Sequence, residues 1–296
     1  MDYNYYRMTI TIGFHGRLGN QLFQYAVLRN ISIIKGYDLY VDTTYECQGQ
    51  QNLLRFFNIA ESSQIVAPFE YNYNQPNGSN YFDSNVYNIP DNTALRGYFE
   101  NVQYFKENLE VIQNELIVKD QQVISFTDEY FRSISNDGTK KVIGIHFRRG
   151  DILQLLGGEL VFKTLQSVLT VDEFNEKMKD YVRKTLEDII IKTNKNITLL
   201  LFTGGIRPSE PVVDGTHHSH NEDIQWVDEF THEYINEYSI HISPGTLENN
   251  ELIDYRLLQM CDYIISPYQS TFSFMAYYTS KRCIQYFSLT NLYGGL

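Results

Sequence analysis

Cysteine and basic residues are scarce in this sequence of 296 residues. The three cysteines, Cys47, Cys261 and Cys283, are widely spaced and form no CxxC pair, which excludes a disulfide framework and a cysteine zinc site and favours a reducing compartment. Lysine and arginine number 24 against 36 acids, a net charge of -12. General binding to nucleic acid or to an anionic membrane needs a basic surface, so we expect neither. Any anionic ligand must therefore be held locally, by a few arginines and backbone amides.

Long apolar runs and a recognisable leader are missing as well. No stretch approaches about 18 consecutive apolar residues, the length needed to cross a membrane. The N-terminal segment MDYNYYRMTITIGF has neither the basic flank nor the apolar core of a signal peptide. We therefore expect a soluble, cytoplasmic protein without a transmembrane segment. The sequence also contains no P-loop GxxxxGK(S/T), no dinucleotide GxGxxG, no GxSxG nucleophile elbow and no HExxH zinc motif.

Segments of β-like and helical pattern alternate along the chain. The composition, 43% hydrophobic and 20% charged, is that of an ordinary globular protein. A chain of this length buries about 75% of the surface that its unfolded form exposes, so it needs no disulfide or metal for stability. Strands alternating with helices imply right-handed crossovers and parallel sheets. The predicted strands are 8–15, 38–42, 93–99, 141–147, 196–202, 238–242, 263–266 and 283–287; the predicted helices are one from the turn at 16–20 to Gly36, then 102–116, 171–191, 224–236, 251–262 and 271–280.

A polar, irregular stretch at 118–140 divides the chain. It ends in Ser135-Asn136-Asp137-Gly138-Thr139, a cluster typical of a linker. The polar residues of 72–80 are typical of a loop for the same reason. We therefore predict two α/β domains, residues 1–138 and 139–296, with a cleft between them.

The first candidate segment is GRLGNQ at 16–21, which follows a strand and opens a helix. Gly16 and Gly19 allow a sharp turn and a close approach of the backbone to a ligand, and the helix N-terminus offers amides to an anion. The alternative is a tight structural turn in which Asn20 and Gln21 cap the helix. The residues alone leave both interpretations open.

The second candidate segment is HFRRGD at 146–151, at the carboxyl end of a buried strand, where open α/β sheets bind their ligands. Arg148 or Arg149 can clamp a diphosphate bidentately. Gly150 frees the turn and Asp151 can orient a guanidinium. A surface ion pair between Arg149 and Asp151 is the alternative, but the location at a strand end favours a ligand site.

The third candidate segment is STFSF at 270–274, which begins a helix after the strand at 263–266. The hydroxyls of Ser270, Thr271 and Ser273, together with the first-turn amides, can form a neutral cradle for an anion. Helix capping alone explains one of these hydroxyls. The histidines of THHSH at 216–220 have no partner acids or cysteines at ligand spacing, so we interpret them as a solvated loop and expect no metal site.

Taken together and in this order, these segments resemble the α-1,2-fucosyltransferases, family eleven of the glycosyltransferases, and the wider superfamily with an HxRRGD box. The resemblance covers nearly the whole chain in collinear order. It implies an α/β fold of the GT-B type, with two Rossmann-like domains facing across a cleft, residues 1–138 on the acceptor side and residues 139–296 binding the nucleotide sugar. The segments that carry it are GRLGNQLFQYA (16–26), LRGYFENVQYF (95–105), VIGIHFRRGD (142–151) and LLQMCDYIISPYQSTFSFMA (257–276).

The resemblance further implies inverting transfer of L-fucose from GDP-β-L-fucose to a glycan hydroxyl, galactose O2 in this family, without a metal or other cofactor. The donor and the glycan are the expected partners. Carried over by position, Arg148 holds the β-phosphate and His146 and Arg149 shape the same pocket. Loss of GDP develops negative charge, which arginine and helix-end amides can stabilise.

Other functional positions follow from the same resemblance. The loop from Gly16 to Gly19 and the side chain of Asn20 face the diphosphate or the fucose from the first domain. The acceptor hydroxyl loses its proton late or to a carboxylate, for which Asp151 and Glu100 are the nearest candidates. The residues expected to contact the donor are Gly16, Arg17, Gly19, Asn20, Arg149, Ser270, Thr271 and Ser273, and those expected to be catalytic are His146, Arg148 and Asp151.

The chain departs from the family pattern after the strand at 196–202. Where the family has a Ser-Asp-Asp segment that helps to recognise the nucleotide, this sequence has Thr203-Gly204-Gly205. A donor on the base edge would lose its acceptor there. A GT-B transferase with another donor or linkage, and a nucleotide-sugar-binding protein without turnover, therefore stay as alternatives.

Overall fold

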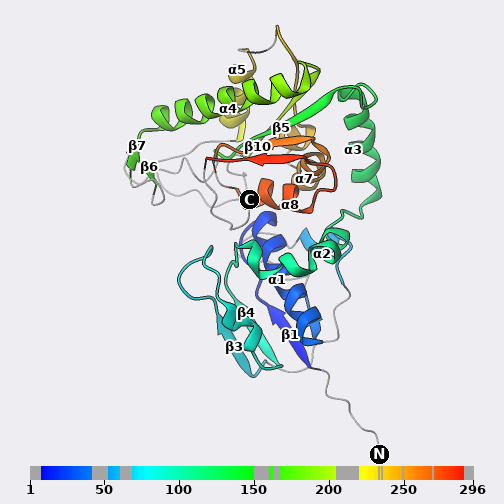
Figure 1. Cartoon of the computed structure of the whole chain (residues 1–296), viewed down its shortest axis with the longest axis vertical. Helices are drawn as coiled ribbons and strands as arrows, with labels where there is room; N and C mark the ends of the chain where they lie inside the picture. The colour runs from blue at the N-terminus through cyan, green and yellow to red at the C-terminus, as the bar shows by residue number, and fades with distance from the viewer. Residues whose placement is uncertain are drawn as a thin grey trace, which may run out of the picture. The chain divides into compact units, whose positions relative to one another are not determined.

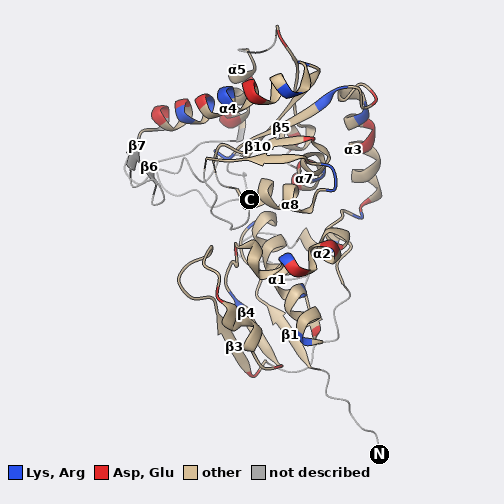
Figure 2. Ribbon diagram, in the orientation of Figure 1, with Lys and Arg blue, Asp and Glu red and all other residues tan. Residues whose placement is uncertain are grey.

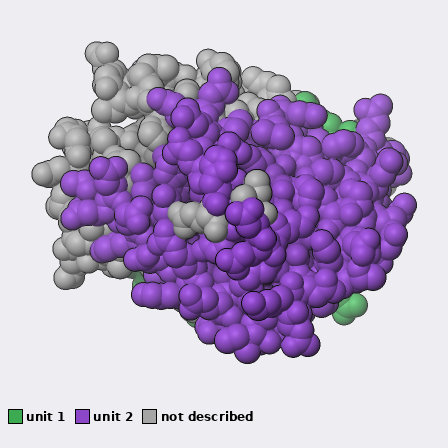
Figure 3. All heavy atoms as spheres, turned by 90° about the horizontal axis from the view of Figure 1, so that it is seen from above, with its two compact units in different colours: residues 1–120, 291–296 green, residues 121–290 purple. Residues whose placement is uncertain are grey.

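The computed structural model describes residues 8–41, 53–60, 69–149, 160–162, 167–204, 220–232, 234, 236–248, 250–268 and 270–289. The chain divides into two compact units, coloured separately in Figure 3. Unit 1 comprises Met1–Asp120 with Asn291–Leu296, and unit 2 comprises Gln121–Thr290. Each unit is built on a parallel sheet of its own (Figure 1).

The sheet of unit 1 has the strand order β2-β1-β4-β3, and all its pairings are parallel. Its interior strands are β1 (Thr9–Ile12) and β4 (Thr93–Arg96), and its edges are β2 (Asp38–Tyr40) and β3 (Tyr71–Asn74). The helix α1 (Leu18–Lys35) packs on β1 and buries most of its length. Two short 3-10 helices, η1 (Leu53–Phe56) and η2 (Ser84–Asn88), lie between these strands in the sequence.

Two predictions for unit 1 are wrong. The polar stretch 72–80 is not all loop, because residues 72–74 belong to the edge strand β3, whose mostly exposed YNYN sequence has no apolar alternation. The helix predicted at 102–116 is broken at Phe105, whose backbone is not helical (φ -146, ψ 4). Tyr104 and Phe105 are both fully buried, and a regular helix would turn consecutive side chains about 100° apart. The segment instead forms η3 (Val102–Tyr104), η4 (Lys106–Asn108) and α2 (Leu109–Glu115).

The sheet of unit 2 has the strand order β11-β10-β5-β8-β9, again parallel throughout. Numbered from β5, this is the order 3-2-1-4-5 that is typical of a Rossmann-like domain. A two-stranded antiparallel ribbon pairs β6 (Leu160–Phe162) with β7 (Ser167–Leu169). The sheet strands are β5 (Lys141–Phe147), β8 (Ile197–Thr203), β9 (Ser239–Ile242), β10 (Tyr263–Ile265) and β11 (Gln285–Phe287). The helices are α3 (Gln121–Ile134), α4 (Val171–Thr193), α5 (His220–Thr231), α6 (Pro244–Glu248), α7 (Glu251–Met260) and α8 (Thr271–Thr279).

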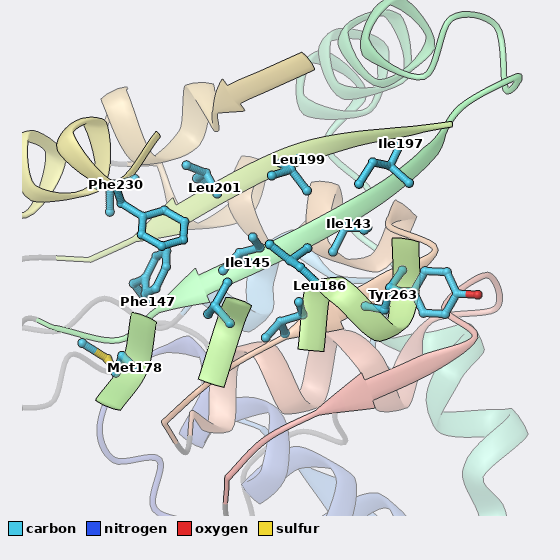
Figure 4. Close-up of a cluster of buried hydrophobic side chains, with 14 of the residues drawn as sticks. Ile143, Ile145, Phe147, Met178, Leu186, Ile197, Leu199, Leu201, Phe230 and Tyr263 are labelled. Atoms are coloured by element: carbon cyan, nitrogen blue, oxygen red, sulfur yellow. The ribbon is translucent and has the colours of Figure 1, made fainter. Parts of the chain in front are cut away.

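Side chains of β5 alternate between the two faces of the sheet. Ile143, Ile145 and Phe147 lie in the core cluster with residues of α4 and α5, as Figure 4 shows. Gly144 points the other way, where an added Cβ would lie 2.9 Å from Sγ of Cys261 after α7. Glycine at 144 thus lets the second layer of helices pack close to β5.

The prediction that residues 118–140 form an irregular linker is also wrong. Residues Gln121–Ile134 form α3, which packs against α7 within unit 2. Arg256 of α7 donates hydrogen bonds to Thr127 Oγ1 (2.8 Å) and Asp128 Oδ1 (2.7 Å) of α3. The helix is amphipathic but mostly polar, and only three of its side chains, Thr127, Phe131 and Ile134, are buried.

Among the described residues, no helix is long and apolar enough to cross a membrane.

Candidate functional site

The strand order of unit 2 reverses between β5 and β10. From β5 the chain builds β8 and β9 on one side and then crosses to β10 and β11 on the other. Such a switch point opens a crevice outside the carboxyl ends of the two strands, which is where α/β sheets bind ligands. Ile145 and Ile265 are paired across β5 and β10, so the segments that follow them lie side by side. These are the two segments that the sequence singled out, at 146–149 and 270–274.

Strand alternation predicts that the two adjacent arginines point to opposite faces of the sheet. Phe147 contacts Trp226 and Phe230 of α5, with ring centroids 5.1 and 5.0 Å apart, and Arg149 follows it on that face. His146 instead lies 5.7 Å from the ring of Phe272 in the first turn of α8. The contact of Arg149 with α5 and the ring contact of His146 with α8 therefore lie on opposite faces of the sheet.

His146 is a buried, neutral imidazole. The residue is only 8% exposed. This burial, with a smaller contribution from the charge of Arg148, lowers the pKa of His146 to about 3. Within the described part of the chain, its Nδ1 atom is buried without a hydrogen-bond partner. A buried polar atom of this kind indicates a ligand or a water in the native site.

Arg148 lies on the same side as His146. It directly follows β5, is half-buried, and its charge acts on the imidazole of His146. Strand alternation places it on the face of α8 rather than that of α5. The guanidinium is therefore carried at the switch point, where it can meet an anion.

The N-terminus of α8 completes this face. Ser270 is its N-cap and accepts from the amide of Ser273 (3.4 Å). Ser273 Oγ in turn donates to Ser266 Oγ (3.0 Å) and lies 3.3 Å from Tyr286 Oη, so its hydroxyl is engaged inside the fold. Thr271, the first helical residue, is half-buried. Of the three predicted hydroxyls, two are buried and stabilise the helix start, while Thr271 is the more accessible.

Arg149 is enclosed between α4 and α5. The residue is 2% exposed, its Nε donates to Asp223 Oδ1 (2.8 Å), and its Nη1 donates to Asn175 Oδ1. Its guanidinium carbon lies 4.0 Å from the ring centroid of Trp226. Burial lowers the pKa of Arg149 below its ordinary value, and the charge of Asp223 opposes this. Asp223, Asn175 and Trp226 carried no sequence signal, because nothing in their spacing relates them to residue 149.

Hydrogen bonds hold the segment at the end of β8, where the sequence departs from the family pattern. Thr203 Oγ1 donates to the carbonyl of Phe147 (3.0 Å), and its amide donates to Thr246 Oγ1 (3.3 Å). Thr246 Oγ1 also donates to Asp254 Oδ2 (2.9 Å), which is buried. At Gly204 an added Cβ would meet no heavy atom of the described residues within 4 Å. The segment thus has room for a side chain at 204, although this chain has none there.

The glycine turn of unit 1 lies at the switch point of its own sheet, between β1 and β4. Gly16 adopts a left-handed conformation (φ +73), and a Cβ there would lie 2.3 Å from Asn20 Nδ2. Arg17 is the N-cap of α1 and makes no side-chain capping bond, and Gly19 is buried in its first turn. Glycine at 16 therefore allows both the turn and the close approach of the Asn20 side chain.

Two buried glutamines of α1 hold this turn: Gln21, which the sequence analysis considered as a helix cap, and Gln24, which it did not select. Gln21 Nε2 donates to the carbonyl of Gly16 (3.0 Å). Gln24 accepts from the amide of His15 (2.9 Å) and donates to its carbonyl (3.2 Å). Their signal was the burial of glutamine on an apolar helix face, which requires a specific partner.

The remaining predicted positions are less informative. Glu100 follows β4 in unit 1 and accepts from Ser79 Oγ (2.7 Å). Asp151 and His217 lie outside the described residues. Among the residues that are described, no group of three or more histidines, cysteines or acids is arranged to hold a metal ion.

No protein-family model and no curated protein sequence matches this chain. Solved structures do. Fucosyltransferase NodZ from Bradyrhizobium is 14% identical, with 90% of this chain and 91% of that chain covered and a TM-score of 0.55. POFUT1 in complex with GDP-fucose is 10% identical, with 94% and 97% covered and a TM-score of 0.50. A variant of FUT1 from Arabidopsis thaliana in complex with GDP is 11% identical, with 96% and 70% covered and a TM-score of 0.53. The chain therefore has the GT-B fold of the fucosyltransferases, with two Rossmann-like domains.

Proposed function

We propose that the protein is an inverting fucosyltransferase that transfers L-fucose from GDP-β-L-fucose to a glycan hydroxyl, specifically galactose O2. The observation that carries the proposal is the shared face of His146, Arg148 and the N-terminus of α8 at the β5–β10 switch point. The likeness to fucosyltransferases bound to GDP-fucose or GDP supports the donor class. The α-1,2 linkage rests on the sequence resemblance, since NodZ is named as an α-1,6-fucosyltransferase.

In the proposed mechanism, Arg148 binds the β-phosphate of the donor and stabilises the charge that GDP gains as it leaves. The first-turn amides of α8 and the hydroxyl of Thr271 add neutral donors to the same phosphates. His146 is neutral at physiological pH, so it contributes a hydrogen bond from its ring rather than a positive charge. This set of groups can stabilise a departing diphosphate by itself.

The N-terminal domain, residues 1–138, is proposed to supply the acceptor side. The turn from Gly16 to Asn20 would contact the diphosphate or the fucose, and the acceptor hydroxyl would attack the anomeric carbon from the face opposite GDP. Asp151 and Glu100 remain the proposed bases for its proton. Residues 139–296 are proposed to bind the nucleotide.

A second candidate is a GT-B transferase that uses a different nucleotide sugar. The observation in its favour is the Thr203-Gly204 segment, where Thr203 is engaged by Phe147 and Thr246 and Gly204 presents no carboxylate to a base.

Calorimetric titration with GDP, UDP and ADP, without added metal, tests the donor class. We expect the wild-type protein to prefer GDP, and Arg148→Ala to weaken GDP binding about tenfold to a hundredfold, the effect of one lost charged hydrogen bond. The matched control is Arg183→Ala on the mixed-charge surface of α4 (Figure 2), where Arg183 Nη1 lies 2.7 Å from Asp180 Oδ1. Preference for UDP, or no nucleotide binding, would contradict the proposal. Release of fucose from GDP-fucose, and transfer to lactose, would then distinguish an enzyme from a binding protein.

A further inference from the structure

We propose that Arg149 is a positioning residue, whose buried guanidinium fixes the end of β5 so that Arg148 is presented to the diphosphate. This inference rests on the proposed function, since it assigns a role within the same donor site. It differs from the role implied by sequence resemblance, in which both arginines shape the phosphate pocket.

The contacts of Arg149 join three elements. Asp223 and Trp226 belong to α5, and Asn175 belongs to α4, so one guanidinium connects both helices to the chain two residues beyond β5. Arg149 is 2% exposed and Asp223 is fully buried. Removing one partner of such a buried ion pair strongly destabilises the folded protein, because the other charge stays buried without compensation. Arg149 is therefore held by the fold in the orientation observed.

The direction of the side chain separates Arg149 from the ligand face. Phe147 and Arg149 contact α5, whereas His146 contacts α8. Because successive residues of an extended chain point to opposite sides, we infer that Arg148 shares the face of His146. To reach a diphosphate beside Arg148, the Arg149 guanidinium would have to leave Asp223, Asn175 and the Trp226 ring. Anchoring residue 149 restricts the backbone of its neighbour, residue 148.

The neighbouring backbone is fixed from a second direction. Thr203 Oγ1 donates to the carbonyl of Phe147, so the peptide before Arg148 is tied to β8 while the residue after it is tied to α4 and α5. Arg148 is thus flanked by two anchors. Misplacement of a catalytic group by about 1 Å can cost about a hundredfold in rate, so these anchors affect function without touching the ligand.

The substitution Asp223→Asn distinguishes positioning from direct contact by the sign of its effect. If Arg149 bound phosphate directly, removing its acidic partner would free the guanidinium and tighten GDP binding. If Arg149 is a positioning residue, Asp223→Asn and Arg149→Met both weaken GDP binding. The double variant then binds GDP no more weakly than the single variant with the lower affinity. We expect losses of about threefold to thirtyfold, the range for couplings carried through packed side chains. Arg149→Lys should recover part of the loss.

The protein's single tryptophan gives a second measurement that needs no substitution. Because Trp226 lies against the Arg149 guanidinium, its emission should keep its wavelength maximum when GDP saturates the wild-type protein. A clear shift, or tighter GDP binding by folded Asp223→Asn, overturns the positioning role while leaving the proposed function intact. Far-UV circular dichroism confirms that each variant is folded, and Asn175→Ala replaces any variant that is not. Absence of GDP binding by the wild-type protein refutes the proposed function and this inference together.

Discussion

The two units fix the chain at their switch points by different means. In unit 1 the turn after β1 is held by amide side chains, since Gln21 and Gln24 bond to the backbone of Gly16 and His15. In unit 2 the chain after β5 is held by a buried ion pair, Arg149 with Asp223. A neutral clamp loses two hydrogen bonds when it is removed, whereas an ion pair leaves a buried charge behind. The same task is therefore sensitive to substitution to different degrees.

The largest expected effect compares one substitution from each clamp. Asp223→Ala leaves the Arg149 guanidinium buried without its acid and should lower the free energy of unfolding by about 3–5 kcal/mol. Gln24→Met removes the two hydrogen bonds to the His15 amide and carbonyl and should lower the free energy of unfolding by about 1–3 kcal/mol. Urea unfolding, followed by Trp226 emission for unit 2 and by circular dichroism for the whole chain, measures both.

The exposed pair of Asp180 and Arg183 supplies the control for this comparison. Asp180 is mostly exposed, so Asp180→Ala should cost about 1 kcal/mol or less. A loss for Gln24→Met equal to or larger than that for Asp223→Ala would show that charge is not what distinguishes the two clamps.

The next effect concerns the glycine turn of unit 1. Gly16→Ala adds backbone strain of about 1–2 kcal/mol and also displaces Asn20, because the new Cβ would lie 2.3 Å from Nδ2. Gly36→Ala is a matched control, since Gly36 has a similar φ of +68 but, in the described part of the chain, no atom within 4 Å of an added Cβ. We expect both variants to lose stability through the backbone strain, but only Gly16→Ala to lose fucosyl transfer. Equal activity of the two variants would remove Asn20 from the proposed mechanism.

The locations of the candidate segments were predictable from the sequence, because strand ends and helix starts follow from apolar periodicity and glycine. The segments at 16–20, 146–149 and 270–273 do lie at switch points. What could not be predicted was the direction of each side chain. Strand alternation alone would have separated Arg148 from Arg149, but the extended chain had to continue two residues beyond Phe147, and only tertiary packing against Trp226 decides that.

The fold errors have a similar cause. In α3, only a few residues, the last of them Ile134, are buried, and exposed polar side chains make up most of the rest. The composition therefore indicated a linker, although contacts with α7 stabilise a helix there. In β3, exposed tyrosine and asparagine alternate without an apolar face. Both elements are stabilised by partners far away in the sequence, which local pattern does not reveal.

A smaller effect comes from the buried imidazole of unit 2. Because burial lowers the pKa of His146 to about 3, the unfolded chain binds more protons than the folded one between that value and the ordinary 6.5. The free energy of unfolding therefore decreases as the pH is lowered below 6.5. The decrease from this group is up to about 2 kcal/mol between pH 7 and pH 5. His146→Gln should unfold with a smaller difference between these pH values. An unchanged difference would mean that the imidazole is solvated and titrates normally.

The smallest expected change in stability is at Gly204, where the chain departs from the family pattern. Gly204→Asp places a carboxylate in open space, so the free energy of unfolding should change by about 0.5 kcal/mol or less. If this segment faces the base edge, the new carboxylate accepts from guanine and should improve GDP binding about threefold to tenfold relative to UDP. Gly204→Asn has the same shape without the charge and should give a smaller gain. Calorimetry with both nucleotides decides the matter: an unchanged ratio would place base recognition elsewhere and leave the phosphate contacts of Arg148 to account for donor binding.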